Sequence, residues 1–201
     1  LLLLPLGNTS FFGFPMLEAT IGLESIKYAI IYDQFGTFLI LAIYGSFVIA
    51  YFEGKSVKLI EISKKIAFFP PFIFLILAFF ITIPQDVVPY LTILSKTLVP
   101  LALISVGFSM QLNLGNEKII FAKAILLKLF VIPIIVLSLF MVIGINDLNA
   151  KTILLESAMP PMITAGALAI SAGFAPRLSA ALVGYGILFG IVSCVFFDYI
   201  F

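Results

Sequence analysis

The sequence predicts an all-α, polytopic membrane protein, and its composition, the length of its apolar segments and the placement of its charges all point to that class. Of the 201 residues, 63% are hydrophobic and only 10% are charged, and the mean hydropathy is +1.27. A water-soluble domain of this composition would expose a very large apolar surface. The charged residues form short clusters between apolar runs of about 20 residues, the length that crosses the hydrocarbon core as a helix.

Seven apolar segments are expected to span the membrane as helices. The first five, in chain order, cover residues 1–21, 28–52, 66–83, 88–112 and 119–143. The remaining block, 151–201, is too long for one span, and Gly173, Pro176 and Arg177 in the stretch SAGFAPRLS divide it into two helices. No charged flank or polar loop precedes Leu1, so we expect it to lie within a membrane segment of a longer protein and not in a signal peptide.

The basic residues predict the orientation of these segments, because Lys and Arg accumulate in cytoplasmic loops. The longest loop, 53–65, reads EGKSVKLIEISKK and contains Lys55, Lys58, Lys64 and Lys65. Placing this loop in the cytoplasm also places Lys118 and Arg177 there. The first span then runs outward and the span that starts at Lys151 runs inward, so these two spans are antiparallel.

Several classes of function are excluded by residues that the sequence lacks. It contains one cysteine, Cys194, and no histidine, so disulfide frameworks, metal sites built on His and Cys, and nucleophiles activated by histidine are not available. An intramembrane aspartyl protease needs two catalytic aspartates, and the Tyr32-Asp33 pair has no GxGD-like counterpart. The net charge of +1 is too small to indicate nucleic-acid binding. We therefore expect no enzyme activity, no metal, no cofactor and no nucleic-acid partner.

Two oppositely directed spans contain helix-breaking residues together with polar ones. Residues 7–15 of the first span read GNTSFFGFP, and Pro160 and Pro161 lie near the middle of the span that starts at Lys151. Irregular backbone at membrane depth is tolerated only where protein or a wet cavity covers its unpaired N–H and C=O groups. Half-helix ends at such breaks can bind ions, so a crossed pair of broken helices is typical of secondary transporters. Simple kinking by Pro and Gly is the alternative explanation.

Three motifs resemble the auxin efflux carrier family of membrane permeases, and the likeness covers essentially the whole chain. GNTSFFGFPML is similar to the fourth helix of that family, LVPLALISVGFSMQL to the seventh and LLESAMPPMITAGALA to the broken ninth. The resemblance implies a ten-helix protein of the cell membrane built from two inverted five-helix repeats. Residues 1–52 would be helices 4–5 of its crossover (transport) unit, 53–65 a cytoplasmic loop, 66–112 helices 6–7 of its scaffold unit, and 113–201 helices 8–10 of the crossover unit.

The resemblance also implies a secondary transporter that moves a small organic anion, such as a carboxylate, by alternating access. In that family the anion is held where the fourth and ninth helices cross, by an Asn-Thr pair that corresponds to Asn8 and Thr9. The Asn8 amide offers two donors to a carboxylate, and its position at a break predicts that it faces the cavity. The expected substrate-binding residues are Asn8, Thr9, Ser10, Lys128, Pro160, Pro161 and Thr164. An anion channel or a sodium-coupled symporter of the bile-acid type is the alternative function.

Ionisable residues inside the membrane are functional candidates because burying a charge is costly. Glu156 lies one helical turn before Pro160, so its carboxylate and the carbonyls freed by the break could bind a coupling ion or proton. The alternative role for Glu156 is a pair with Lys151 or a bond to a neighbouring helix. Lys128 lies about 15 Å along its span from Lys118 and needs a partner. That partner is either a substrate carboxylate or a structural group, such as an acidic side chain or a helix C-terminus.

Two further features are interpreted as helix packing. Asp33 is expected to pair two helices, and Gly186 and Gly190 in GYGILFG form a GxxxG spacing that permits close approach of another helix. Packing within the chain accounts for this spacing, and a homodimer is the alternative. The expected partners are therefore the lipid bilayer, a small organic anion and, in that alternative, a second copy of the chain.

Overall fold

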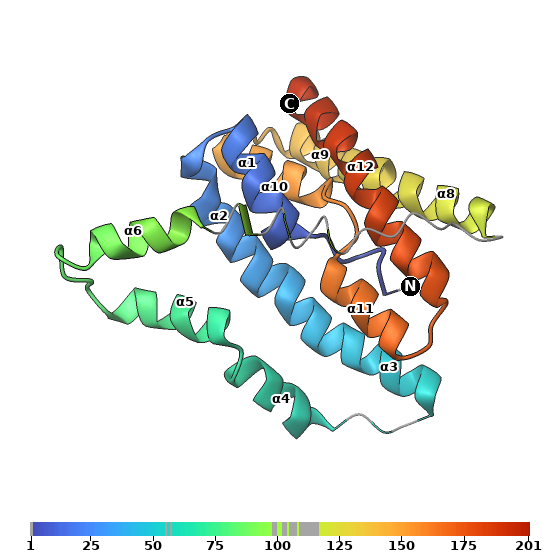
Figure 1. Ribbon diagram of the computed structural model, residues 1–201. Coiled ribbons are helices and arrows are strands. Elements are labelled where there is room, and N and C mark those ends of the chain that lie inside the picture. The colour runs from blue at the N-terminus through green and yellow to red at the C-terminus, as the bar shows by residue number, and fades with distance from the viewer. Residues whose placement is uncertain are drawn as a thin grey trace.

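The computed structural model describes residues 2–201 apart from 55, 57, 98–99, 102–103, 105–107 and 109–116. Over the described residues the chain is all-α, and the predicted fold class is confirmed (Figure 1). Three of the described helices are long and apolar enough to cross a membrane: Leu23–Glu53, Lys118–Ile143 and Pro176–Ile200.

The first predicted span is helical only in its later part. A π-helical segment, η1 (Thr9–Gly13), continues directly into α1 (Phe14–Thr20), and the described residues before it are not helical. The prediction of a span over 1–21 is therefore wrong for its beginning. Pro5 has no N–H to give to a helix, and the backbone that follows it pairs with a distant part of the chain instead.

The second predicted span, 28–52, is confirmed and extends further at its N-terminal end. One continuous helix covers Leu23–Glu53. In chain order it consists of η2 (Leu23–Ser25), α2 (Ile26–Ile31), the π-helical segments η3 (Tyr32–Phe38) and η4 (Leu41–Gly45), and α3 (Ser46–Glu53). The helix ends at Gly54, whose φ of +66° is the left-handed conformation in which helices commonly terminate.

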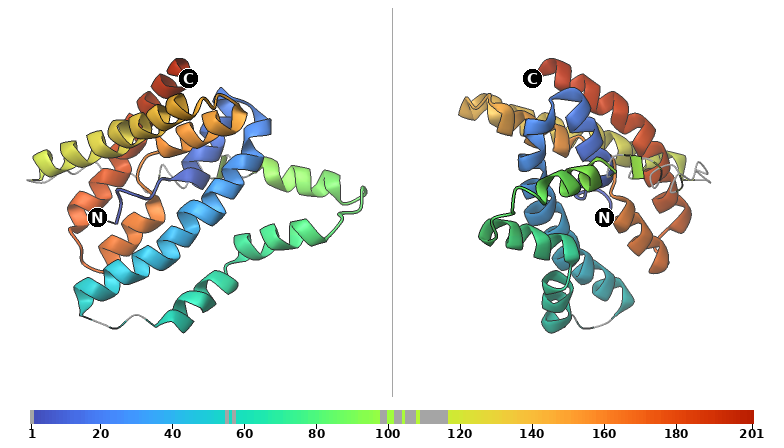
Figure 2. Two further views of the ribbon diagram at one scale, coloured as in Figure 1. Left: turned by 180° about the vertical axis from the view of Figure 1, so that it is seen from behind. Right: turned by 60° about the vertical axis from the view of Figure 1, so that its left-hand side comes forward.

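Three shorter helices lie together on one side of this long helix, as Figure 1 and Figure 2 show. They are α4 (Leu59–Ala67), α5 (Pro70–Phe80) and α6 (Val88–Lys96). α4 begins inside the segment predicted as a loop, because its apolar residues recur at helical spacing and the Lys58–Glu61 ion pair, at 3.4 Å, supports its first turn.

α5 is shorter than the predicted span 66–83. It ends at Phe80, and Ile81 has extended backbone, because the β-branched residues 81–83 lead into Pro84, which disfavours helical backbone in the residue before it. Much of the second half of the predicted span 88–112, including most of the LVPLALISVGFSMQL motif, lies outside the described residues.

The predicted span 119–143 is confirmed as the continuous helix Lys118–Ile143. It consists of α8 (Lys118–Leu126), the π-helical segment η5 (Leu127–Val131) and α9 (Ile132–Ile143). It ends at Gly144, whose φ is +76°.

The next helical segment is broken where the two consecutive prolines lie. α10 (Leu148–Ser157) begins at the cap residue Asp147, whose carboxylate accepts a hydrogen bond of 2.8 Å from the Ala150 N–H. Residues 158–162 are not helical, and the chain becomes helical again in α11 (Ile163–Ser171). The predicted interruption of this span is confirmed.

The predicted division of the last block is also confirmed. Gly173, with φ of +76°, and Ala175, with φ of 40°, turn the chain, and Pro176 then occupies the first turn of α12 (Pro176–Ile200). α12 is the most buried of the three long helices and packs against α1, α8, α10 and α11. It therefore forms the surface on which the broken segments rest.

Candidate functional site

The two non-helical segments lie against each other deep inside the molecule. The Asn8 N–H donates to the Pro160 carbonyl at 2.7 Å, and the Met162 N–H donates to the Leu6 carbonyl at 3.0 Å. Gly7 and Pro161 form an isolated antiparallel bridge between these two bonds. The pairing satisfies backbone groups that a membrane interior cannot hydrate. The two broken segments therefore meet, as the family resemblance implies, and we call the paired residues 6–8 and 160–162 the crossing.

The two prolines of the α10–α11 break sit on two glycines of α12. A Cβ placed on Gly186 would lie 2.7 Å from Pro161 Cδ, and one placed on Gly190 would lie 2.9 Å from Pro160 Cδ. Real Cβ atoms do not approach rings this closely, so the GxxxG spacing is what lets the proline rings reach the α12 backbone. The interpretation of this spacing as packing within the chain is confirmed.

A network of buried hydrogen bonds links the crossing to the long helix Leu23–Glu53. The Thr9 hydroxyl donates to Asp33 Oδ1 at 2.5 Å, and the Gln34 amide donates to Asp33 Oδ2 at 2.7 Å. All three side chains are buried. The expectation that Asp33 pairs two helices is therefore confirmed, but the sequence did not place Asp33 and Gln34 beside Thr9.

Three of the π-helical segments supply polar residues to this region. Thr9 lies in η1, Asp33 and Gln34 lie in η3, and Lys128 lies in η5. A π-helical turn contains one residue more than an α-helical turn and changes the direction in which the following side chains project. No pattern in the sequence identifies these turns, which is why the expected α-helical faces did not predict the cluster.

Glu156 is the least satisfied polar side chain of the site. It lies in the last turn of α10, its residue is 0% exposed, and neither carboxylate oxygen has a hydrogen-bond partner among the described residues. The carboxylate lies on the η1 backbone, because a Cβ on Gly13 would be only 2.8 Å from Glu156 Oε2. The alternative that Glu156 pairs with Lys151 is wrong, since Lys151 pairs with Asp198 at 3.1 Å.

Lys128 is buried beside Gly7. Its ammonium group donates to the Ser157 carbonyl at 3.4 Å, and a Cβ on Gly7 would lie 3.4 Å from the same nitrogen. Ser157 is the last residue of α10, so the structural partner of Lys128 is a helix C-terminus, one of the two kinds of partner predicted for it. No ion pair between described residues includes Lys128 or Glu156.

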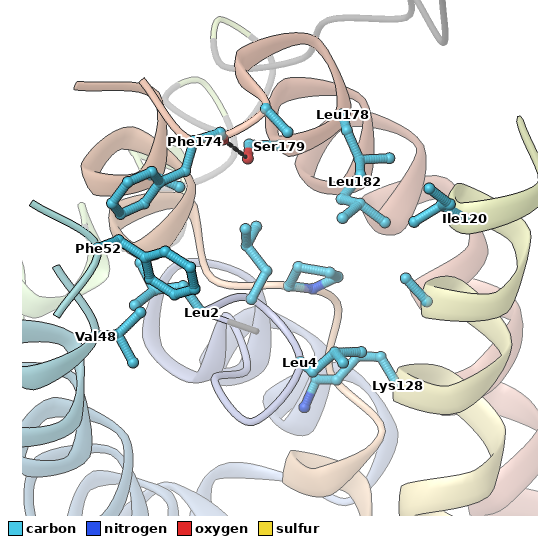
Figure 3. A pocket seen from close by; sticks show the side chains of 15 residues that line it. Leu2, Leu4, Val48, Phe52, Ile120, Lys128, Phe174, Leu178, Ser179 and Leu182 are labelled. Carbon is cyan, nitrogen blue, oxygen red and sulfur yellow. Dashed lines mark hydrogen bonds between the residues drawn. The ribbon is translucent and has the colours of Figure 1, made fainter. Parts of the chain in front are cut away.

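An apolar cavity of about 310 Å³ lies next to the crossing (Figure 3). Phe52, Val48 and Leu2 line one side in the view of Figure 3, and Ile120, Leu178 and Leu182 line the other. Lys128 and Pro161 also line the cavity. They connect the cavity with the crossing, because the Lys128 ammonium lies close to Gly7 and Pro161 pairs with Gly7.

The structure separates the expected substrate-binding residues into three groups. Asn8, Thr9 and Pro160 are buried at the crossing and do not line the cavity, whereas Lys128 and Pro161 do. The expectation that Asn8 faces the cavity is wrong, because the pairing of its backbone with Pro160 buries it to 1% exposure. The remaining two residues do not line the cavity either: they are the half-buried Ser10 and the exposed Thr164.

The side chains of the crossing are suited to hydrogen bonding and charge balance. Asn8 Nδ2 is a buried donor without an acceptor among the described residues. Asp33 and Lys128 both interact electrostatically with Glu156. Among the residues that the structure describes, no group of three or more His, Cys, Asp or Glu side chains is placed to hold a metal ion.

The sequence is similar to a known family and to a known transporter. Residues 1–197 match the family described as membrane transport protein. An uncharacterized transporter of Methanocaldococcus jannaschii is 31% identical over 167 residues, which are 77% of this chain and 52% of that protein. The chain thus spans about half the length of this relative. No solved structure matches the chain.

The family match, the similarity to a transporter and the membrane-spanning helices agree on a multi-pass membrane protein concerned with transport. The match covers nearly the whole chain and includes both broken segments and the residues at their crossing. The chain belongs to the membrane transport protein family, the family of auxin efflux carrier type that its motifs resemble.

Proposed function

We propose that the protein is a secondary carrier that moves a small organic anion across the cell membrane by alternating access. The observation that carries the proposal is the crossing itself. Two non-helical segments are paired inside an apolar interior, and the buried Asn8 amide between them has a donor without an acceptor. A buried polar group without a partner is costly, and a bound ligand that supplies the acceptor would remove that cost.

An anion suits the donors that surround the crossing. The N-terminal amides of η1 follow Asn8 directly, and α11 begins two residues after Pro161. Helix N-termini favour negative charge, and the Lys128 ammonium lies beside Gly7. Thr9, Ser10, Pro160 and Pro161 shape this substrate site in our proposal.

The cavity supplies a route to the crossing and a place for the hydrocarbon part of a substrate. Its wall is almost entirely apolar, with Lys128 as the charged side chain that lines it. The Phe52 and Phe174 rings, 5.4 Å apart, bring the end of α3 close to the start of α12 at the cavity. We assign this end to the cytoplasm, because the lysines of residues 53–65 and Arg177 lie beside it in the sequence.

Alternating access also requires a part of the molecule that moves and a part that stays. We assign residues 66–112 to the scaffold unit, and residues 1–52 and 113–201 to the crossover unit. The placement of α5 and α6 on one side of the long helix, away from the crossing, supports this assignment (Figure 1). Glu156 is our candidate for coupling transport to an ion or a proton.

Thermal unfolding of the purified full-length protein with a panel of carboxylates tests the proposal. The panel contains acetate, butyrate, phenylacetate, malonate and malate. A ligand at about 100 times its Kd stabilises the native state by about 2.7 kcal/mol, so at least one member should raise Tm in a concentration-dependent manner. We expect the monocarboxylates with an apolar body to raise Tm more than malonate or malate, because the cavity wall is apolar.

Flux in proteoliposomes then distinguishes a carrier from an anion channel. A carrier should show saturable uptake that is stimulated by unlabelled substrate on the opposite side, whereas a channel should show neither property. A panel without any stabilising member, or flux that does not saturate, would contradict the proposed function.

A further inference from the structure

The charges at the crossing do not balance. Asp33 and Glu156 contribute two carboxylates, and Lys128 contributes one ammonium group. With all three ionised, the buried cluster carries one excess negative charge. Asp33 is stabilised by its hydrogen bonds from Thr9 and Gln34, so the charge without a partner belongs to Glu156.

An isolated ionised carboxylate is very costly in an apolar interior, and the usual outcomes are that it binds a cation or takes up a proton. The cluster as it stands would also repel an anion that enters the crossing. Neutralising Glu156 removes both difficulties, because the cluster then carries equal numbers of positive and negative charges.

We infer that the Glu156 carboxyl group takes up one proton for each anion that binds at the crossing, so that the site carries the anion and the proton together. This inference rests on the proposed function. The proton comes from the solution on the side where the anion enters, and it leaves with the anion on the other side. The protein is in this view a proton-coupled carrier.

A proton fits the surroundings of Glu156 better than a metal ion does. Hard cations such as Ca²⁺ and Mg²⁺ need about six oxygen ligands. The Glu156 carboxylate lies on the backbone of Gly13, and each oxygen of Asp33 already accepts a hydrogen bond, from Thr9 or from Gln34. A proton needs only one oxygen atom of Glu156.

A protonated Glu156 also completes the set of donors for a carboxylate. Its O–H and the Asn8 amide could each donate to one oxygen of the bound anion. Gly13 connects the two residues, because its N–H donates to the Asn8 carbonyl at 2.9 Å and its Cα faces the Glu156 carboxylate. The proton would therefore strengthen anion binding as well as balance the charge.

The other titratable groups near Glu156 do not offer an equivalent proton site. Those that interact with it electrostatically are Tyr32 and Asp33 of η3, Lys128 of η5 and Cys194 of α12. A tyrosine and a cysteine are ordinarily neutral near pH 7. Asp198 of α12 pairs with Lys151, and Glu24 of η2 pairs with Lys27 of α2 at the surface. η1 and α9 contain no titratable side chain.

Calorimetry of anion binding to the purified full-length protein tests the inference directly. The probe is the member of the carboxylate panel with the largest effect on Tm. Binding is measured at a series of pH values, each in buffers of different ionisation enthalpy, which gives the number of protons taken up for each anion at each pH. We expect this number to rise to about one as the pH passes through the range in which the free protein loses that proton, and the apparent Kd to rise tenfold for each pH unit above that range.

Glu156→Gln is the decisive variant, because the amide imitates the neutral carboxyl group at the same size. It should bind the probe without proton uptake and with an affinity that does not change with pH. Glu18→Gln is the matched control, since Glu18 is exposed on α1, and it should keep the proton uptake and the pH dependence of the unmodified protein.

The outcomes separate this inference from the proposed function. If no panel member binds the unmodified protein at any pH, the proposed function fails. If the probe binds without proton uptake at every pH of the series and with an affinity that does not change with pH, the inference is overturned while the carrier proposal stands, and this result does not depend on whether Glu156→Gln folds. Binding that requires sodium, when compared with N-methylglucamine at the same pH, would also overturn it in favour of a sodium ion at Glu156.

Discussion

At the scale of single residues, the crossing combines groups that are satisfied with groups that are not. Asp33 receives two hydrogen bonds and Lys128 donates one, whereas Asn8 Nδ2 and both oxygens of Glu156 have no partner among the described residues. Most buried polar groups in proteins are paired, so the exceptions indicate where a ligand or a proton completes the structure. Gln34 Oε1 and Asn149 Oδ1 are also buried without a partner among the described residues, but Asn8 and Glu156 belong to the two segments that meet at the crossing.

Asn8→Ala should weaken binding of the panel carboxylate by about 10- to 100-fold. A hydrogen bond to a charged group contributes about 1.5–3 kcal/mol, and each 1.4 kcal/mol corresponds to about tenfold in affinity. Asn8→Asp should weaken binding further, because it adds a negative charge beside the anion. Calorimetric titration measures both effects.

Asn146→Ala is the control for the Asn8 variants, because Asn146 is exposed in the turn before α10 and should bind the probe normally. Normal binding by Asn8→Ala would assign Asn8 to the helix break alone. The search for the anion contact would then move to Lys128, which lines the cavity.

At the scale of elements, the break between α10 and α11 is held by a complementary surface on α12. Pro160 and Pro161 interrupt the helix, and Gly190 and Gly186 provide the space that their rings occupy. A proline pair alone would only kink a helix. The contact with α12 fixes where the interrupted backbone lies, so it can pair with the segment that contains Asn8.

Gly186→Ala should destabilise the protein, because the new Cβ would lie 2.7 Å from Pro161 Cδ, an atom of a rigid ring. Overpacking of this kind typically costs about 1–3 kcal/mol, which exceeds the gain of at most about 1 kcal/mol from replacing Gly by Ala in a helix. We expect a lower Tm and weaker probe binding.

A double-mutant cycle with Pro161→Ala tests whether the contact itself is responsible. The second change removes the ring atoms that the Gly186→Ala methyl group would meet, so the two substitutions together should cost less than the sum of their separate effects. Gly36→Ala is the control, because Gly36 is helical and its added Cβ would meet nothing within 4 Å. Additive effects of Gly186→Ala and Pro161→Ala would show that the glycine serves another purpose.

At the scale of the whole molecule, the long helix Leu23–Glu53 divides the described structure. α4, α5 and α6 lie on one side of it, and α11 and α12 lie on the other (Figure 1). The Phe38 and Phe69 rings stack 3.9 Å apart and join the start of α5 to η3. The arrangement agrees with a division into a scaffold and a crossover unit, which remains a proposal.

Cysteine accessibility in intact cells should place Lys58, Lys64, Lys118 and Arg177 on the cytoplasmic face. Each position is replaced singly by cysteine and tested with a membrane-impermeant thiol reagent. Cys194, the only cysteine of this sequence, is buried, so an introduced thiol should be labelled above that background. The four positions should be protected in intact cells and labelled in inverted vesicles.

Glu24→Cys supplies the opposite signal. It lies at the other end of the helix Leu23–Glu53, whose 31 residues span about 46 Å at 1.5 Å per residue. It should therefore be labelled in intact cells. Labelling of Arg177→Cys on the same side as Glu24→Cys would contradict the predicted orientation.

The sequence by itself determined the class of the molecule and the places where its helices stop. Composition and segment length predicted a membrane protein, and the spans 28–52 and 119–143 were found as continuous helices. Pro160-Pro161 and the turn at Gly173 also ended helices where expected. These predictions succeeded because they depend on local chemistry: an apolar run of a given length, a missing N–H, or a glycine that adopts positive φ.

Only the tertiary structure decided which polar groups meet. Thr9 and Asp33 are 24 residues apart, and Gly7 pairs with Pro161 from the other end of the chain. Contacts of this kind depend on how distant segments dock. They also depend on the π-helical turns in η1, η3 and η5, since one extra residue rotates the following side chains by about 100° around the helix axis. The sequence therefore identified Asn8, Lys128 and Glu156 as candidates. The docking of distant segments and the rotation of side chains at the π-helical turns decided where these residues lie. Asn8 is buried outside the cavity, Lys128 lines the cavity, and Glu156 lies on Gly13 without a partner among the described residues.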